Sequence, residues 1–182
     1  MTDTLYVPLA DGDLRLEPLA ERHRERLRAA TAADTDIWEI YPVDYAGEAF
    51  DPGFDKLLHA APQRRVYAIY SGKRVVGMTA WIERGELGWA IEIGNSYIAP
   101  DLRGTGFNTC LKHLMLGHAF ACGLTRVEFR VDERNQRSGA AVLKLGAKKE
   151  GVLRAERITW TGHVRDTGVF SILAEEWAAI KG

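Results

Sequence analysis

The chain has 182 residues, of which 46% are hydrophobic and 27% charged, and its formal net charge is −1. This composition is that of an ordinary globular protein, and the low net charge gives no reason to expect direct nucleic-acid binding or a membrane partner. At this length one core buries most of the apolar surface without disulfides or a structural metal. We therefore expect one domain spanning residues 1–182.

Cysteine, histidine and the start of the chain give no sign of a metal, a disulfide or a membrane. Cys110 and Cys122 fall in one expected helix, too far apart to bridge, and two thiols do not define a metal site. His113 and His118 lack the glutamate of a zinc-binding His-Glu-x-x-His pair. No signal-peptide pattern opens the sequence and no apolar run is long enough to span a bilayer, so we expect a cytoplasmic protein.

The first part of the chain predicts a strand, a helix and a hairpin. Alternating leucines predict a short strand over Leu14–Leu19, and a charged helix follows over Glu21–Ala30. The aromatic-rich stretch Thr31–Phe54 is typical of short, interrupted helices. β-Branched and aromatic residues over Val66–Tyr70 and Arg74–Ile82, joined by Ser-Gly-Lys, predict an antiparallel hairpin.

The run "LGWAIEIGNSYIA" predicts the next strand. Its larger side chains occupy one face and its smaller ones, with Glu92, the other. The glycine at Gly94, followed by Asn95, predicts a bulge or a close approach of another group to the backbone. The large-residue face is made of Leu87, Trp89, Ile91 and Ile93; the other carries Gly88, Ala90, Glu92 and Gly94.

The second part of the chain predicts alternating helices and strands and a closing hairpin. Helical spacing runs from Phe107 to a stop at Gly123, and "RVEFRV" is the next strand. A helix over Asn135–Leu145 ends at Gly146, and "RITWTGHVRDTGVFSIL" forms a second hairpin before a short tail. No repeat or linker is visible.

The stretch "IAPDLRGTGFNT" turns a strand into a helix on two glycines. Glycine lets a backbone approach an anion closely, and a helix N-terminus offers unpaired N–H groups to it. A plain tight loop is the alternative. A P-loop is excluded because no lysine lies between Arg103 and Cys110. A dinucleotide fingerprint fails because the third glycine of its pattern is missing and antiparallel strands come first.

The segment Arg103-Gly104-Thr105-Gly106-Phe107-Asn108 resembles the acetyl-CoA signature of the GNAT N-acetyltransferases, Arg/Gln-x-x-Gly-x-Gly/Ala. More narrowly, "EIGNSYIAPDLRGTGFNT", "NQRS" and "LGAKKEGVLR" are similar to the RimJ/RimL-type branch, which contains the ribosomal-protein N-terminal acetyltransferases. The resemblance follows the element order from Leu14 to Leu173 and is specific from Glu92 to Arg154. Asn108 departs from the signature, but a small polar residue fits the first helical turn.

This resemblance implies an α+β (mixed α/β) fold, with a mostly antiparallel twisted sheet whose fourth and fifth strands splay apart around acetyl-CoA, the acetyl donor. The splayed strands are those ending at Ser96-Tyr97-Ile98 and running over Val127–Val131. The pyrophosphate would rest on the N–H groups of the glycine turn. The cofactor-binding residues implied are Tyr97, Ile98, Arg103, Gly104, Thr105, Gly106, Phe107, Asn108, Thr109, Asn135 and Ser138.

Acetyl transfer to an amine requires a polarised carbonyl, a neutral amine and a stabilised thiolate. A backbone N–H near Tyr97 or Ile98, exposed by the bulge, would polarise the carbonyl, unless the bulge only redirects the strand. The resemblance implies that Asn135 holds the pantetheine arm and that Ser138 is a proton donor to the thiolate. A helix N-cap with a spare hydroxyl is the alternative for this pair.

Two carboxylates are candidates for the base. Glu92 lies among small residues, where burial would raise its pKa towards the operating pH. An ion pair with an arginine of a neighbouring strand is the equally weighted alternative. Glu156 is the second candidate, because a carboxylate there faces the acceptor side in some relatives.

The acceptor side is the least defined by the sequence. We expect Trp38, Tyr41 and Trp81 to contact the amine as part of an aromatic wall, although such residues are more often core.

The acceptor is expected to be a protein N-terminus, a peptide or a small aminoacyl compound. We expect the protein to be a monomer or a homodimer. A coenzyme-A-binding sensor without turnover is the alternative function; a phosphotransferase lacks a P-loop lysine and paired magnesium carboxylates. The remaining aromatic candidates are Tyr45, Phe50, Phe54 and Trp160.

Overall fold

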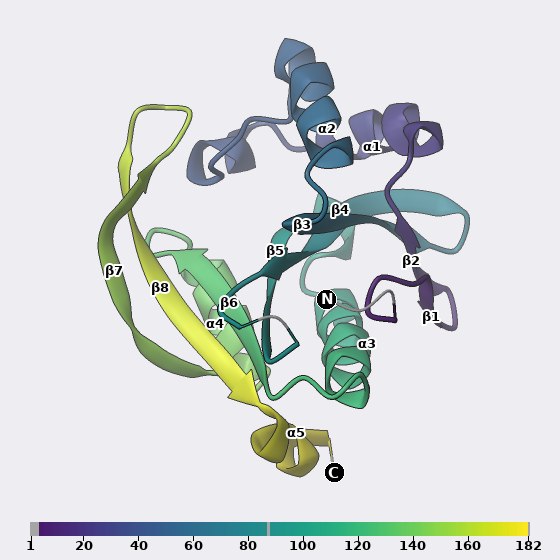
Figure 1. Ribbon diagram of the computed structural model, residues 1–182. Coiled ribbons are helices and arrows are strands. Elements are labelled where there is room, and N and C mark those ends of the chain that lie inside the picture. The colour runs from purple at the N-terminus through teal and green to yellow at the C-terminus, as the bar shows by residue number, and fades with distance from the viewer. Residues whose placement is uncertain (1–3, 87, 182) are drawn as a thin grey trace.

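The protein is described by a computed structural model covering residues 4–86 and 88–181. Within these residues, eight strands form one sheet in the order β1-β2-β3-β4-β5-β6-β8-β7 (Figure 1). All neighbouring strands are antiparallel except β5 and β6. This confirms the predicted mixed α/β fold. The strands are β1 (Leu9–Asp11), β2 (Leu14–Pro18), β3 (Arg64–Ser71), β4 (Arg74–Glu83), β5 (Ala90–Ile98), β6 (Arg126–Asp132), β7 (Lys148–Ile158) and β8 (Val164–Leu173).

Helices cover both faces of the sheet (Figure 1). One face carries α1 (Arg24–Thr31) and α2 (Phe50–Leu58), and the other carries α3 (Phe107–Ala121) and α4 (Gln136–Lys144). The chain then closes on α5 (Ala174–Lys181). Short 3-10 turns are η1 (Glu21–His23), η2 (Asp36–Ile40), η3 (Gly47–Ala49) and η4 (Pro100–Leu102). No helix in the part of the chain that the structure describes has the length and apolar character needed to cross a membrane.

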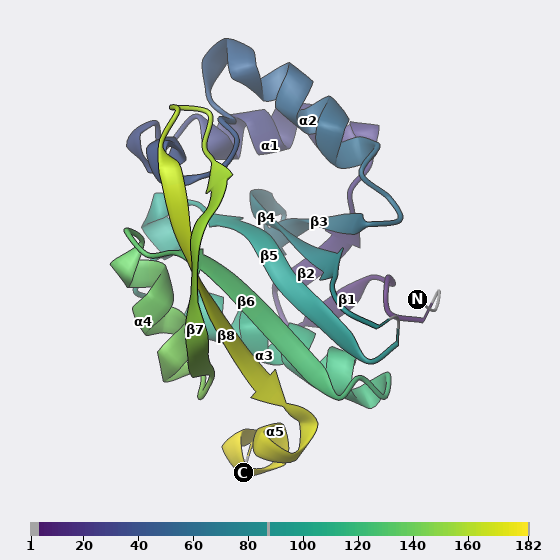
Figure 2. The same cartoon turned by 60° about the vertical axis from the view of Figure 1, so that its left-hand side comes forward.

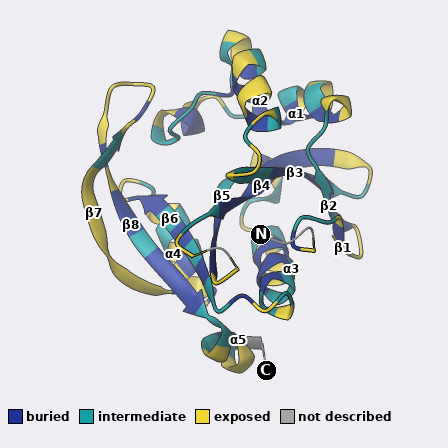
Figure 3. Cartoon of the chain, in the orientation of Figure 1, coloured by how far each residue is buried: buried dark blue, intermediate teal, exposed yellow. Residues whose placement is uncertain are grey.

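The alternation of side chains along the central strands builds a separate core on each face. On β3, Tyr67 and Ile69 pack with α3, whereas Val66, Ala68 and Tyr70 pack with α1 and α2. Figure 3 shows these central strands as buried, while the outer strand β7 is exposed along most of its length. The molecule is thus three layers deep around its central strands, and the fold positions the site at a break between two of them.

The break lies between β5 and β6, as Figure 2 shows. Their parallel pairing runs only from Ala90 opposite Arg126 to Glu92 opposite Glu128. A bulge follows in β5, where Ala80 pairs with Gly94 but Met78 pairs with Tyr97. Because the bulge bends β5 as β6 turns to pair with β8, the two strands separate. The predicted bulge and the predicted splay of these strands are confirmed.

Gly94 is required at this bulge by the groups around it. A Cβ there would lie 2.6 Å from an oxygen of Glu92 and 2.7 Å from the Ile82 side chain. The next residue, Asn95, has a φ of +52°, in the left-handed region that asparagine tolerates better than most residues. The interruption in the sequence therefore marks both a close approach and a turn of the backbone.

The predicted elements are mostly found where the sequence placed them, with differences at the start of β5 and near both ends of the described chain. The strand expected from Leu87 begins at Ala90; Trp89 is exposed, and Leu87 lies outside the described residues. A first strand, β1, was missed because it has only three residues. The first predicted hairpin, the interrupted helices before Phe54 and the helix after the glycine turn are confirmed. The closing hairpin is present, but its first strand begins at Lys148 and not at Arg157, and the expected tail is the helix α5.

Candidate functional site

A cleft of about 420 Å³ occupies the opening between β5 and β6. Its lining comes from both faces of the sheet: Phe129 and Val131 point to the α3 face, and Glu92 and Arg130 to the α1 and α2 face. The cleft also receives residues of η2, of the glycine turn and of the β7–β8 hairpin. Such a passage lets two ligands meet from opposite sides of the sheet.

The glycine turn forms one wall of the cleft and leads directly into α3. Gly104 and Gly106 have φ angles of +79° and +90°, and Gly106 is the N-cap of the helix. The first bond of the helix runs from the Cys110 amide to the Gly106 carbonyl (3.1 Å), so the amides of residues 107–109 precede the helical pattern. A Cβ at either glycine would meet nothing within 4 Å, so the space outside the turn is open. This arrangement suits an anion.

Other predicted residues of the turn have structural roles beside this anion site. Gly104 and Asn108 line the cleft, whereas the Thr105 hydroxyl is exposed and donates to the Leu102 carbonyl (2.8 Å). Phe107 packs against the core on the α3 face, and Thr109 follows Asn108 in the first turn of α3. The side chains of Thr105 and Phe107 therefore stabilise the turn and its packing, while the backbone amides of residues 107–109 lie at the N-terminal end of α3.

Arg103 is held at the end of β5, beside the turn. Its Nε donates to the Ile98 carbonyl (2.9 Å), its guanidinium pairs with Asp34, and it lies 5.5 Å from the centre of the Tyr97 ring. Ile98 lines the cleft, but the Tyr97 side chain turns into the core and donates to the Ala30 carbonyl (2.9 Å). Arg103 is therefore held in place near the helix N-terminus, with Asp34 as its counter-charge.

Asn135 and Ser138 both line the cleft, at the start of α4. The Asn135 side chain accepts a hydrogen bond from the Ser138 amide (3.0 Å), so it is the N-cap that the sequence allowed. The capping bond joins the side-chain oxygen of Asn135 to the Ser138 backbone amide, so the Ser138 hydroxyl takes no part in it. Capping and facing the cleft are thus compatible in this pair.

The two candidate bases are both ion-paired. Glu92 is 5% exposed, and its carboxylate lies 2.7 Å from Arg84 Nε and 3.8 Å from Arg130 Nε. Glu156 accepts two bonds from Arg157 (2.6 and 3.0 Å), and chiefly this contact lowers its pKa to about 2. For Glu156, this pairing stabilises the charged carboxylate and weakens it as a base.

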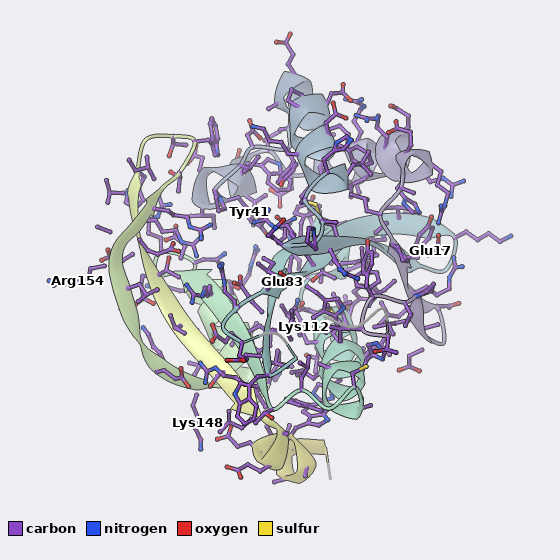
Figure 4. All side chains as sticks on the ribbon, viewed as in Figure 1. Glu17, Tyr41, Glu83, Lys112, Lys148 and Arg154 are labelled. Carbon is purple, nitrogen blue, oxygen red and sulfur yellow. The ribbon has the colours of Figure 1, made fainter. Side chains whose placement is uncertain are left out.

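Lys112 is a cleft residue that the sequence did not single out. It lies on α3, is 5% exposed, and its Nζ donates to the Ser96 hydroxyl (2.6 Å), which in turn contacts Thr79 (2.9 Å). Burial lowers its pKa to about 7. Figure 4 shows Lys112 and Tyr41 on opposite sides of the β4–β5 region. The available signal was its spacing, which puts a lysine on the same helix face as Met115 and Leu116.

Of the three aromatic residues expected at the acceptor, Tyr41 lines the cleft, and its hydroxyl donates to the Ser96 carbonyl. Trp38 and Trp81 do not line it. Trp38 is 1% exposed and packs on Tyr41 at 5.0 Å between ring centres. Trp81 points to the α3 face because β4 alternates, and its indole nitrogen lies 3.3 Å from the Tyr67 hydroxyl. Both are core residues.

The chain is similar to known acetyltransferases in both sequence and fold. The family model of the acetyltransferase (GNAT) domain matches residues 13–148. An acetyltransferase crystal structure from T. thermophilus is 34% identical, with a TM-score of 0.85 over 96% of this chain and 93% of that one. A GCN5-related N-acetyltransferase from Brucella melitensis is 27% identical, with a TM-score of 0.87 over 96% and 81%. No curated protein matches the sequence.

A more distant structure shares the fold alone. The spermidine N-acetyltransferase from Vibrio cholerae, in complex with CoA and spermine, is 19% identical, with a TM-score of 0.72 over 92% of this chain and 99% of that one. The resemblance to the RimJ/RimL-type branch stays a prediction. The family match over most of the chain shows that this protein belongs to the GNAT acetyltransferases and is an acyltransferase.

Proposed function

We propose that the protein transfers the acetyl group of acetyl-CoA to a primary amine, by direct attack within a ternary complex. The observation that carries this proposal is the open cleft between β5 and β6, with the left-handed glycine turn and the α3 N-terminus at its wall. The CoA bound to the same fold in the V. cholerae structure supports it. In keeping with the RimJ/RimL-type resemblance, the acceptor is the α-amine of a protein, a peptide or a small aminoacyl compound.

The cofactor enters from the α3 and α4 face. The amides after Gly104 and Gly106 bind the pyrophosphate, and the positive end of the α3 dipole favours its charge. The Arg103 guanidinium, already fixed by Ile98, adds a cation beside it. Asn135 and Ser138 lie along the arm that carries the thioester into the opening. No metal takes part in this proposal.

The thioester carbonyl is polarised at the bulge of β5. In this proposal, a backbone amide of β5 beyond Asn95 donates to the oxygen on which negative charge develops. The amine nitrogen attacks the carbonyl carbon, the carbon–sulfur bond breaks, and the thiolate takes a proton from Ser138 or from Lys112. Lys112 suits this step because it is buried beside Ser96 and its pKa is about 7, so it holds a proton in part of the molecules.

We propose that removal of the amine proton does not depend on one strong base. Because Glu92 and Glu156 are both paired with arginine, we propose that the amine loses its proton mainly to water, with Glu92 as the carboxylate closest to the bulge. The rate should then rise with pH towards the amine's own pKa. A fall of about 10²-fold or more in Glu92→Gln, with loss of the acidic limb, would return the role of base to Glu92.

The experiment that tests the proposed function is a screen of primary amines with acetyl-CoA, following the release of free thiol. Release that depends on both acetyl-CoA and an amine is the expected result. Binding of acetyl-CoA without amine-dependent release from any N-terminal peptide or small amine would instead indicate a coenzyme-A-binding module.

A further inference from the structure

The cleft wall on the α1 and α2 face is rich in arginine. Side chains alternate along β6, so Phe129 packs into the core on the α3 face while Arg130 points the other way. Arg165 reaches the same wall from β8. The arginines that line this end are Arg64, Arg84, Arg130, Arg157 and Arg165, and the lining carboxylates are Glu92 and Asp132.

Each carboxylate near this wall already has a closer arginine partner than Arg130 or Arg165. A short, charged hydrogen bond of this kind fixes the orientation of the carboxylate towards its closer arginine. The pairs are Glu92 with Arg84 (2.7 Å), Glu156 with Arg157 (2.6 Å), Glu128 with Arg126 (3.0 Å) and Asp132 with Arg134 (2.8 Å).

Arg165 is the buried cation that these pairs leave without a close partner. It is 6% exposed, its Nε has no hydrogen-bond partner among the described residues, and the nearest carboxylate oxygen, of Asp132, lies 3.9 Å away. Its one hydrogen bond is long, from Nη2 to the Arg130 carbonyl (3.4 Å). Burial, and then the charge of Arg157, lower its pKa.

Arg130, next to Arg165, shares one of these features. Its Nε is also buried without a hydrogen-bond partner in the described part of the chain, and the nearest carboxylate oxygen, of Glu128, lies 3.5 Å away. A buried guanidinium that lacks a hydrogen-bonded counter-charge is costly, and this describes Arg165. Arg130 is half-buried, and its carboxylate neighbours lie 3.5–3.9 Å away, so it adds a second cation to a wall where an anion would bind favourably.

The phosphates of the cofactor do not account for these arginines. The proposed phosphate site, at the glycine turn and the α3 N-terminus, follows the C-terminal end of β5, where Asp34 and the Tyr97 ring hold the Arg103 guanidinium. Arg130 and Arg165 lie beside Glu156 and Arg157 of β7. The tip of the β7–β8 hairpin reaches η2, where the Trp160 indole donates to the Trp38 carbonyl (2.8 Å). This is the side from which an acceptor amine would approach.

We propose that the acceptor amine carries a carboxylate, which binds to Arg165 and Arg130 and directs the amine towards the opening between β5 and β6. This inference rests on the proposed acetyl transfer and names its substrate class. The planar guanidinium fork matches the two oxygens of a carboxylate. The same wall repels a polycation such as the spermine bound in the V. cholerae structure.

The test compares acceptors that differ only in a carboxylate. The dipeptide amides Glu-Ala-NH₂ and Gln-Ala-NH₂ test a side-chain carboxylate; alanine and alaninamide test an α-carboxylate, with rates expressed per neutral amine. Spermidine is the cationic comparison. We expect kcat/KM to favour the carboxylate member of at least one pair by about tenfold or more, as charged hydrogen bonds allow.

A second readout keeps the test independent of turnover. With coenzyme A present at saturation, the carboxylate member should raise the melting temperature and its neutral counterpart should not. If no amine is acetylated but this shift is found, the proposed transfer fails and the anion site stands. Equal shifts and equal rates within both pairs, or a preference for spermidine, would overturn the carboxylate assignment.

The variant pair Arg165→Gln and Arg154→Gln assigns the effect to the cleft. Arg154 lies on the same hairpin but is exposed and points away from it (Figure 4). Discrimination should fall towards one in Arg165→Gln and persist in Arg154→Gln. If Arg165→Gln does not fold, Arg130→Gln makes the same comparison. Discrimination that survives in the folded cleft variants would contradict the proposal.

Discussion

At the scale of single residues, Lys112 combines a structural cost with a position in the cleft. Burial lowers its pKa from 10.5 to about 7, a shift that corresponds to roughly 4–5 kcal/mol between its charged and neutral forms. Its hydrogen bond to Ser96 offsets only part of that cost. A buried lysine of this kind is therefore poorly explained by stability alone.

Replacing Lys112 by methionine should stabilise the fold and slow the reaction. The wild-type cost is fully present below pH 7, because the folded protein must then bury the charge. It disappears as the pH rises towards 10.5, because the unfolded chain binds more protons than the folded one in this window. Denaturant unfolding of both proteins at about pH 6 and pH 9.5 should show a gain of about 1–3 kcal/mol at the lower pH and a smaller one at the higher pH. A destabilised variant at the lower pH would show that the ammonium group is well solvated.

Ser138→Ala tests the other proton donor to the thiolate. Its Asn135 cap is retained, because the Asn135 side chain accepts from the Ser138 backbone amide rather than from the hydroxyl. If the hydroxyl assists the departing thiolate, kcat should fall by about 10²-fold or more while the KM for acetyl-CoA changes little. Steady-state kinetics at saturating amine measure this split. Unchanged turnover would leave Ser138 as a residue of the first helical turn only.

At the scale of elements, the glycine turn and α3 form one unit that a pair of matched variants can test. Gly106 and Gly123 both have left-handed φ angles, +90° and +85°, and a Cβ at either would meet open space. Valine at each position therefore carries a similar backbone cost. Only Gly106 lies at the proposed phosphate site, so Gly106→Val should lose coenzyme A binding and Gly123→Val should keep it.

Calorimetric titration of both variants with coenzyme A makes this comparison. An affinity loss of equal size in the two would show that strain in α3, and not access to the turn, is responsible.

The sequence predicted those parts of the fold and site that depend on local chemistry. Gly94 and Asn95 indicated the bulge, and Gly104 and Gly106 indicated the left-handed turn, because each conformation demands its residue type. The ion pairs of Glu92 could not be assigned, since Arg84 and Arg130 reach it from β4's end and from β6 through tertiary packing.

For the same reason, the sequence could not tell which aromatic residues lie in the core and which line the cleft. Trp81 and Tyr41 are both large aromatic residues with no local pattern that separates core from cleft. The face of β4 that carries Trp81 packs on α3, whereas Tyr41 reaches the cleft from the end of η2. Only the arrangement of strands decides which ring is core. Lys112 was missed because a single lysine on an apolar helix face has no distinguishing pattern of its own.

At the scale of the whole molecule, the cleft joins elements far apart in the chain, so its ligand should stabilise the native state as a unit. Acetyl-CoA at a hundredfold excess over its dissociation constant should add ~2.7 kcal/mol, which is roughly 5–11 °C in melting temperature for a protein of this size. Thermal unfolding with and without acetyl-CoA measures the shift. No shift at millimolar acetyl-CoA would remove the glycine turn as a cofactor site.

The central claim is that one open cleft brings acetyl-CoA and an amine together for direct transfer. Quantifying both products in one reaction tests it most directly: free thiol by absorbance and N-acetylated amine by mass spectrometry, with wild type and Gly106→Val. We predict one acetylated amine for each thiol released in the wild type and neither product in the variant. Thiol release without acetylated amine, or equal product from Gly106→Val, would contradict the account.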